Sequence, residues 1–355
     1  KFFGVVKADF AGPEAIFFAF KFDGNVAVIA GLFDDFEVTL PSKEYPIHPD
    51  IARHAQEKKQ EESLIETPLE KKKEAERLLF MSFGSGSSGN CAYLGTYSEG
   101  ILIDAGVDVK HVLDSLAENK IPIESVKGIF LTHDHGDHIR QAYPILRKYK
   151  HIALYCTPKT LNGILRKHSV SRRIKDRHSA IYIEHQYTVG GLTVTPFTVS
   201  HDGSDNVGYH IVKDNQTFTI ATDLGCTDGR LSHYASTADY LMLESNYDRR
   251  MLINGTYAEQ LKARILKDTG HLDNAEAARF VSENYHENLS HVFLCHLSND
   301  NNTPEIAINT MTTALRANGL KVGDDSESIA SREADVRVIA LPRFESSRLF
   351  ILRKD

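Results

Sequence analysis

Residues 132–138 read Thr-His-Asp-His-Gly-Asp-His, and they place four candidate metal ligands within six positions: His133, His135, Asp137 and His138. The run follows Gly128-Ile-Phe-Leu131, an apolar segment typical of a buried strand. Imidazole and carboxylate groups together suit Zn²⁺ and chemically similar ions. In an extended loop, side chains two positions apart point the same way, so His133 and His135 can share one ion. Asp137 and His138 then point elsewhere, which predicts two metals and not one.

Three more candidate ligands stand directly after apolar, strand-like segments. His201 follows residues 192–200, Asp223 follows residues 217–222, and His296 follows residues 291–295. Polar residues at strand ends are expected where a site lies at the edge of a β-sheet core. Each of them alone suits an ordinary hydrogen-bonded residue, but together they complete a dinuclear site. The predicted ligands are His133, His135 and His201 for one metal, Asp137, His138 and His296 for the other, and Asp223 as the bridge.

The order of these ligands is His-x-His-x-Asp-His, followed by a single His, a single Asp and a single His. In this respect the chain resembles the metallo-β-lactamase-fold hydrolases over about residues 78–355. The resemblance implies an α/β protein with an αββα sandwich and two divalent metal ions, Zn²⁺ or Mn²⁺, at one edge. Because this fold hosts many reactions, the ligands alone do not identify the chemistry.

The composition agrees with a globular enzyme. Of 355 residues, 41% are hydrophobic and 25% are charged, which is ordinary globular usage. No apolar run approaches the roughly 18 residues that a membrane span needs, so we expect no membrane contact. The four cysteines lack CxxC spacing, which favours reduced thiols and a cytoplasmic location. The net charge of −7 is not that of a protein coated by nucleic acid.

The chain is predicted to divide into an N-terminal extension, residues 1–76, and a catalytic domain, residues 77–355. In the extension, Asp23-Gly24 between residues 16–22 and 25–30 predicts a β-hairpin. Residues 51–77 carry dense charges of both signs, typical of a solvated helix or linker. The extension contains no motif, so its role stays open.

A glycine- and serine-rich loop follows, and residues 84–89 within it fit G-x-G-x-x-G. A dinucleotide-binding loop would need a helix directly afterwards, whereas residues 91–94 and 101–104 look like strands, so we exclude that function. The loop can present backbone N–H groups to an anion, or it can be a plain tight connection, and both interpretations stay open. Its candidate substrate contacts are Ser85, Ser87, Ser88 and Asn90. Asp104, at a strand end, is predicted to hydrogen-bond a ligand histidine from behind.

Two further residues narrow the chemistry. Glu244 ends an apolar strand, and His271 precedes residues 273–280, a helix predicted to be capped by Asp273 or Asn274. His271 would therefore stand at a helix N-terminus, where anions bind favourably. Either residue alone suits a strand end or a turn. Their order resembles the tRNA 3′-processing endonucleases of this fold, which implies that Glu244 orients His271 and that His271 protonates the leaving oxygen or steadies the phosphate.

A closer resemblance is to the YycJ (WalJ-like) branch of bacterial metallo-β-lactamase-fold proteins. The segments that carry it are residues 83–90, 102–106, 244–246, 269–271 and 295–302. This resemblance implies a nuclease-like enzyme, a DNA exonuclease or a related phosphodiesterase, with nucleic acid as its partner.

A short basic stretch is either a phosphate-backbone contact or a solvated surface segment. It contains Arg166, Lys167, Arg172, Arg173, Lys175 and Arg177, with Asp176 as its one acid. From it we take Arg172 and Arg173 as candidate substrate contacts.

Together these observations predict a dinuclear, metal-dependent phosphodiesterase. Asp137 would bind metal and orient the attacking hydroxide, and His271, held by Glu244, would assist the leaving group. The main alternative is a lactonase or thioesterase of the same fold, which needs the metals but not Glu244, His271 or the basic stretch. A flavodiiron oxidoreductase normally has a carboxylate in place of one motif histidine, and seven intact ligands argue against a catalytically dead interaction protein. The sequence leaves open DNA versus RNA, exo versus endo cleavage, the native metal and the oligomeric state.

Overall fold

The computed structural model describes residues 2–7, 16–22, 25–30, 76–326 and 328–353. Its contacts divide the chain into two units, Lys1–Ile65 and Glu66–Asp355. The first unit contains an antiparallel sheet of β1 (Phe2–Lys7), β2 (Ile16–Phe22) and β3 (Asn25–Ala30). The two predicted hairpin strands therefore pair as expected. The turn at 23–24 and residues 51–75 of the predicted linker lie outside the described residues, and the predicted boundary at residue 76 stays a prediction.

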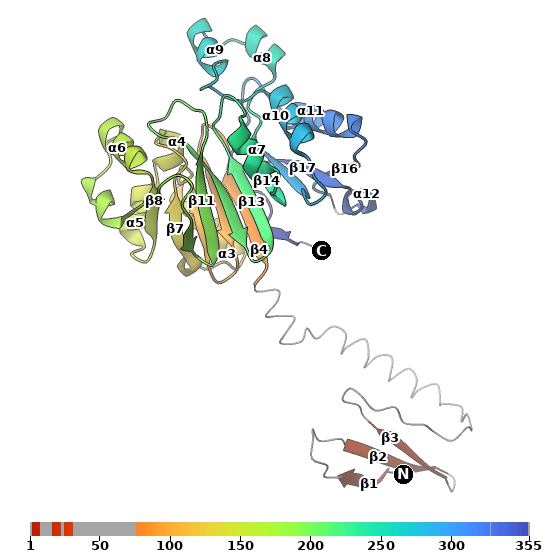
Figure 1. The fold of residues 1–355 in the computed structure, drawn as a ribbon. Coiled ribbons are helices and arrows are strands. Elements are labelled where there is room, and N and C mark those ends of the chain that lie inside the picture. Colours follow the sequence, from red (N-terminus) through yellow and green to blue (C-terminus); the bar gives the residue numbers. More distant parts are fainter. Residues whose placement is uncertain (1, 8–15, 23–24, 31–75, 327, 354–355) are drawn as a thin grey trace. The chain divides into compact units, whose positions relative to one another are not determined.

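Two sheets packed face to face form the centre of the second unit (Figure 1). The first sheet has the order β18 (Phe350–Leu352), β4 (Leu78–Gly84), β5 (Cys91–Gly95), β6 (Gly100–Ile103), β7 (Val126–Phe130), β8 (Ala153–Cys156), β9 (His178–Ala180). The second has the order β10 (Tyr187–Val189), β11 (Leu192–Thr198), β12 (Val207–Lys213), β13 (Gln216–Ala221), β14 (Tyr240–Glu244), β15 (His291–Cys295), β17 (Val336–Ala340), β16 (Val322–Gly323). Buried aromatic rings fill the space between the sheets, with the ring centroids of Phe80 and Phe293 4.7 Å apart.

Helices cover the outer face of each sheet. On the first sheet, buried side chains of α3 (Val109–Glu118), α5 (Ala142–Lys148) and α6 (Pro158–Lys167) join one apolar cluster. On the second sheet, α7 (Gly229–Ala235), α10 (Asn274–Asn284) and α11 (Pro304–Ala317) do the same. The shorter helices are η1 (Ile123–Ser125), α4 (Gly136–Ile139), η2 (Arg172–Arg177), α8 (Arg249–Asn254), α9 (Glu259–Ile265) and α12 (Ile329–Arg332). The predicted αββα sandwich is confirmed.

The strand directions bring the candidate site residues to one edge of the sandwich. β6 runs parallel to β7, and β13, β14 and β15 run parallel to one another, so their carboxyl ends meet at that edge. Three residues beyond these ends adopt left-handed backbone conformations, namely Asp104 (φ 61°), Asp223 (φ 54°) and His296 (φ 54°). Residues other than glycine avoid this region, and such local strain clusters at functional sites.

The N-terminal cap predicted for the helix after His271 is present in the structure. Asp273 caps α10, and its side chain accepts hydrogen bonds from the N–H groups of Ala275 and Glu276. Such a cap satisfies N–H groups that would otherwise have no partner at the start of the helix. Among the described residues, no helix combines the length and the apolar character that a membrane span requires.

Candidate metal centre

The structure brings all seven predicted ligands together. They come from the loop after β7 (His133, His135), from α4 (Asp137, His138) and from positions just past β11, β13 and β15 (His201, Asp223, His296). Candidate ligand atoms lie within 4.8 Å of one another in His133, His135 and His201, and likewise in Asp137, His138 and His296. These groups are the two triads expected from the sequence.

Asp223 lies between the two triads. Its Oδ2 is 3.2 Å from Nε2 of His138, and its Oδ1 is 3.5 Å from Nε2 of His296. The same Oδ1 lies 3.8 Å from Nε2 of His201, in the other triad. One carboxylate thus faces ring nitrogens of both groups, which is the position that a bridging ligand requires.

Hydrogen bonds fix the orientation of three histidine rings. Nδ1 of His138 donates to Asp104 at 2.8 Å, and Nδ1 of His201 donates to the carbonyl of Gly270 at 2.9 Å. Nδ1 of His296 donates to Glu244 at 2.9 Å. Because these oxygens accept, Nδ1 carries a proton and Nε2 is the ring nitrogen that would bind a metal. The predicted hydrogen bond between Asp104 and a candidate ligand histidine is confirmed.

Two buried nitrogens test whether the site suits metal ions. Nε2 of His133 and Nε2 of His296 have no hydrogen-bond partner among the described residues. Burial, together with nearby His138, lowers the pKa of His133 well below its usual range, so its ring stays neutral with a lone pair unused. Burial opposes protonation of His296 as well, but Asp223 and Asp137 outweigh it and raise the pKa of His296 to about 10. The site therefore favours positive charge, which divalent ions would supply in place of protons.

The loop that carries the candidate ligands, residues 132–138, packs against the segment after β6. A Cβ atom at Gly106 would lie 1.5 Å from the carbonyl oxygen of Asp137, so only glycine allows this approach. The N–H of Asn90 donates to the same oxygen at 2.8 Å. Burial opposes ionisation of Asp137, but His296 and His138 outweigh it and lower the pKa of Asp137 to about 2. Asp137 is thus held as a carboxylate at the wall of the site.

Glu244 and His271 form the predicted pair. The Glu244 side chain is fully buried, and its Oε1 accepts from Nδ1 of His271 at 2.8 Å. Its Oε2 accepts from the N–H of Leu224 at 2.8 Å. Oε1 of Glu244 also accepts from Nδ1 of His296, and from Nδ2 of Asn246 at 3.2 Å. The sequence indicated neither hydrogen bond. Glu244 therefore links a proposed metal ligand to His271.

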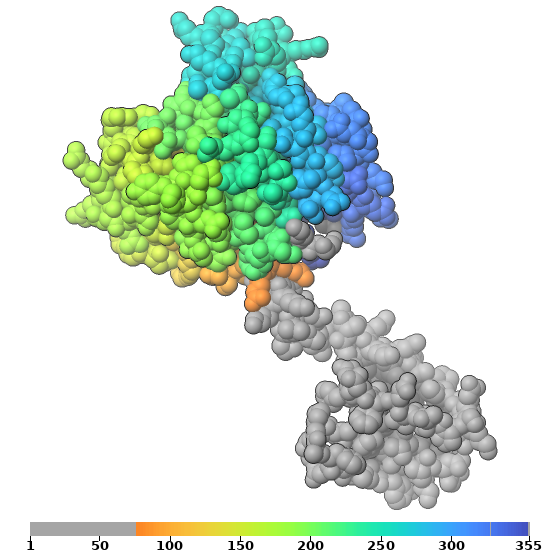
Figure 2. All heavy atoms as spheres, in the orientation of Figure 1, coloured from red at the N-terminus to blue at the C-terminus, as the bar shows by residue number. Residues whose placement is uncertain are grey.

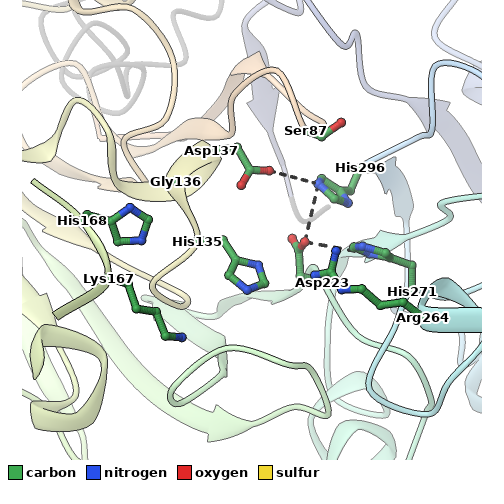
Figure 3. Close-up of a pocket in the computed structure, with 10 residues that line it drawn as sticks. All are labelled: Ser87, His135, Gly136, Asp137, Lys167, His168, Asp223, Arg264, His271 and His296. Carbon is green, nitrogen blue, oxygen red and sulfur yellow. Dashed lines mark ion pairs between the residues drawn. The ribbon is translucent and has the colours of Figure 1, made fainter. Parts of the chain in front are cut away.

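The two triads open into a cavity of about 410 Å³, within the usual range of ligand sites (Figure 3). Its lining consists of Ser87, His135, Gly136, Asp137, Lys167, His168, Asp223, Arg264, His271 and His296. Every lining residue is polar or glycine. Lys167 and Arg264 lie on opposite sides of the candidate metal ligands in Figure 3.

The predicted substrate contacts lie in different environments. In the glycine-rich loop, Ser87 lines the cavity, whereas Oγ of buried Ser85 accepts from the N–H of His296 at 2.9 Å. Buried Asn90 bonds both backbone groups of Gly86, and its Nδ2 lies 2.9 Å from Nε2 of His138. Ser88 donates to the carbonyl of Arg343 at 3.4 Å.

Arg172 and Arg173 are exposed on η2, away from the cavity lining. Of the rest of the basic stretch, Lys167 lines the cavity, and Arg177 bonds the carbonyls of Lys150 and Ile152. Substrate contact by the predicted serine, asparagine and arginine residues stays a prediction.

Some residues at the site belong to no sequence motif, namely Asp202, Arg264 and Arg343. Nε of Arg264 donates to Oδ2 of Asp202 at 2.7 Å, and Nη2 donates to Oδ1 at 3.1 Å. Oδ1 of Asp202 also lies 3.3 Å from Nε2 of His135. Asp202 could have been predicted as a site residue because it directly follows His201. No local sequence feature predicts that Arg264 lies at the site. Arg343 donates to Oγ of Ser87 at 2.6 Å from 256 positions away, which a single sequence does not reveal.

Comparison with known proteins gives a consistent result. The family described as "Beta-lactamase superfamily domain" matches residues 100–293. Exodeoxyribonuclease YycJ of Bacillus anthracis is 33% identical over 250 residues, 70% of this chain and 94% of the relative. Exodeoxyribonuclease WalJ of Streptococcus pneumoniae is 34% identical, over 68% of this chain and 89% of the relative.

Among solved structures, the metallo-β-lactamase fold protein YhfI from Bacillus subtilis aligns with a TM-score of 0.53 at 15% identity, covering 77% of this chain and 99% of that one. This likeness concerns the fold. The sequence relatives, the matched family and the His/Asp cluster typical of a dinuclear site all agree with it. The chain therefore belongs to the beta-lactamase superfamily, as a metallo-β-lactamase-fold hydrolase homologous to the YycJ and WalJ exodeoxyribonucleases.

Proposed function

We propose that this protein hydrolyses phosphodiester bonds in nucleic acid, as a DNA exonuclease or a related phosphodiesterase. The observation that carries the proposal is the cavity lining, which contains no apolar side chain among the described residues. Pockets for small organic ligands are lined mostly by hydrophobic groups. Lys167 and Arg264, on opposite sides, instead suit a substrate with repeated negative charge. The YycJ and WalJ relatives, which are exodeoxyribonucleases, support the same substrate class.

Two divalent ions, Zn²⁺ or Mn²⁺, would be held by the two triads with Asp223 between them. Imidazole and carboxylate ligands suit both ions. When bound, such a pair of ions provides a nucleophile at neutral pH and neutralises charge that develops on the phosphate. His133 and His296 each have a buried Nε2 atom suitable for this purpose.

The chain's own residues position and protonate the substrate. Asp137, held as a carboxylate, orients the attacking group from the wall of the cavity. His271 also faces the cavity, and its Nδ1 is held by Glu244 at 2.8 Å. Its Nε2 is therefore placed to donate a proton or a hydrogen bond to the leaving oxygen. A lactonase or thioesterase would need the metals but has no use for the Glu244–His271 pair or for cations on both sides.

A comparison of DNA substrates tests the exonuclease assignment. Linear single-stranded DNA, a covalently closed circle of the same sequence and the matching RNA are incubated with metal-loaded protein. A DNA exonuclease releases nucleotides from the linear DNA and leaves the circle intact. Linearisation of the circle would establish endonuclease activity, and preferential loss of the RNA would change the substrate assignment.

A further inference from the structure

Residues 249–267, here called the basic arm, comprise α8, the connection to α9, α9 itself and the two residues that follow it. The arm carries five basic residues, Arg249, Arg250, Lys262, Arg264 and Lys267, against one acid, Glu259. The whole chain has the opposite balance, with 48 acidic and 41 basic residues. The basic arm is therefore a local positive region on an acidic protein.

Apolar packing and a hydrogen bond hold the basic arm against the rest of the second unit. Leu252 and Ile265 pack with Tyr247 and Tyr257 in a small apolar cluster. Oη of Tyr257 donates to Asp300 at 2.8 Å, which ties the arm to the loop after β15. Figures 1 and 2 show the arm in cyan, projecting from the body of the unit. Its charges are thus presented on a supported surface.

The cations of the arm differ in what they already bind. Lys262 is turned into the arm and donates to the carbonyl of Ile253, and Arg249 lies 3.8 Å from Asp273. Arg250 and Lys267 are exposed, and their side chains form no ion pair within the described part of the chain. Arg264, near the end of α9, is paired with Asp202 through two hydrogen bonds, and it reaches the cavity with its side chain 49% exposed. The arm therefore extends the positive charge outward from the cavity.

We propose that the basic arm binds the phosphate backbone of a nucleic-acid strand that passes through the cavity. Arg264 contacts the strand at the cavity wall, and Arg250 and Lys267 contact it farther out. On the opposite side, Lys167 belongs to the basic stretch of α6 and η2 and lies 3.0 Å from Asp134, so the strand has cations before and after the metal centre. These contacts act through charge and counterion release and do not read bases. The inference rests on the proposed function, because it assumes a polynucleotide substrate.

A protein partner is the other kind of occupant for this surface. Ile253, Leu261 and Leu266 are exposed by 52%, 38% and 38%, and exposed apolar groups can mark a protein contact. The excess of positive charge and its continuity with the cavity through Arg264 favour nucleic acid. The experiment below separates the two occupants.

The test measures binding of a fluorescent phosphorothioate DNA strand, which resists cleavage, to the metal-loaded full chain across a salt series. The variant is Arg250→Ala/Lys267→Ala. The matched control is Lys127→Ala/Lys148→Ala. It removes two exposed cations near the amino-terminal ends of β7 and β8, whereas the candidate ligands follow the carboxyl end of β7. Single-stranded DNA loses about 0.7 from the slope of log affinity against log salt for each phosphate contact removed. The arm variant should therefore lose about 1.4 in slope and on the order of tenfold in affinity near 0.1 M salt.

The control variant should match the wild type in slope and affinity. Both variants should turn over bis-p-nitrophenyl phosphate at the wild-type rate, because that substrate is too small to reach the arm. Equal slopes for the arm and control variants, with normal DNA binding by the wild type, would overturn the inference alone and point to a protein partner. A wild-type protein that neither binds nor cleaves polynucleotides would overturn the proposed function as well.

Discussion

Oε1 of Glu244 lies 2.8 Å from Nδ1 of His271, and each of these residues offers an atom within 4.8 Å of one from Asp223 and one from His296. The same oxygen lies 2.9 Å from Nδ1 of His296. One buried carboxylate thus fixes the ring of a proposed acid and the ring of a proposed metal ligand. Glu244 would therefore hold the proposed acid and the proposed metal ligand in a fixed relative position. In-line hydrolysis needs this, because the nucleophile attacks phosphorus on one side and the leaving oxygen departs on the other.

The role of His271 can be tested without disturbing the metals. His271→Ala should retain the wild-type metal content and lose phosphodiester cleavage by roughly 10²–10⁴-fold, the usual range for one acid–base group. Elemental analysis and initial rates provide the two measurements. His185→Ala, which changes an exposed histidine outside the cavity lining, serves as the control and should keep full activity. Full activity in His271→Ala would remove His271 from the reaction.

Asp223 should determine how many ions the protein holds. Its carboxylate faces ring nitrogens from both triads, so Asp223→Ala should lose at least one of about two ions per chain. Asp202→Ala is the matched control, because Asp202 lies 3.3 Å from Nε2 of His135 but is not a proposed ligand. This control should keep both ions. Two ions in Asp223→Ala would contradict the bridging assignment.

Much of this site follows from sequence because its residues sit at the ends of apolar strands. His296 and Asp223 each come within two positions of a buried strand, so their convergence needs only the rule that parallel strands end at one edge. Arg264 does not follow an apolar strand. Its position at the site depends on the contact of α9 with the loop that contains Asp202. Ser85 stays a predicted substrate contact. Its hydrogen bond with the N–H of His296 joins residues 211 positions apart, which no local pattern encodes.

The exposed arginines of η2 should act only on long substrates. Arg172→Ala/Arg173→Ala should raise the KM for polynucleotides and flatten its salt dependence, because two backbone contacts are lost. Turnover of a small chromogenic phosphodiester should hardly change. Arginine stems can also contribute packing, and a packing defect would lower the melting temperature and both activities together. Equal losses on long and short substrates would therefore assign these residues to the protein surface alone.

His291 should make the stability of the catalytic unit depend on pH. Burial, helped by Arg337 and Arg348, lowers the pKa of His291 to about 4, whereas an unfolded histidine has a pKa near 6.5. Between these values the unfolded chain binds a proton that the folded chain refuses, so the free energy of unfolding falls as pH falls from about 6.5 to about 4.

Denaturant unfolding at two pH values measures this effect. The contribution of His291 to the loss of stability between pH 7 and pH 5 should be about 2 kcal/mol. His291→Gln cannot titrate and should lose that much less than the wild type over the same interval. Identical losses in the two proteins would show that His291 takes up its proton in the folded state.

The most direct test of a metal-dependent phosphodiesterase is a substrate panel with one preparation of purified protein, loaded in turn with Zn²⁺ and Mn²⁺. The panel contains labelled single- and double-stranded DNA, RNA, bis-p-nitrophenyl phosphate, a lactone and a thioester, and each initial rate is measured with and without a chelator. We predict cleavage of nucleic acid that the chelator abolishes, together with little or no opening of the lactone or thioester. Ready hydrolysis of the lactone or thioester with no cleavage of any phosphodiester would contradict the account and establish a small-molecule hydrolase.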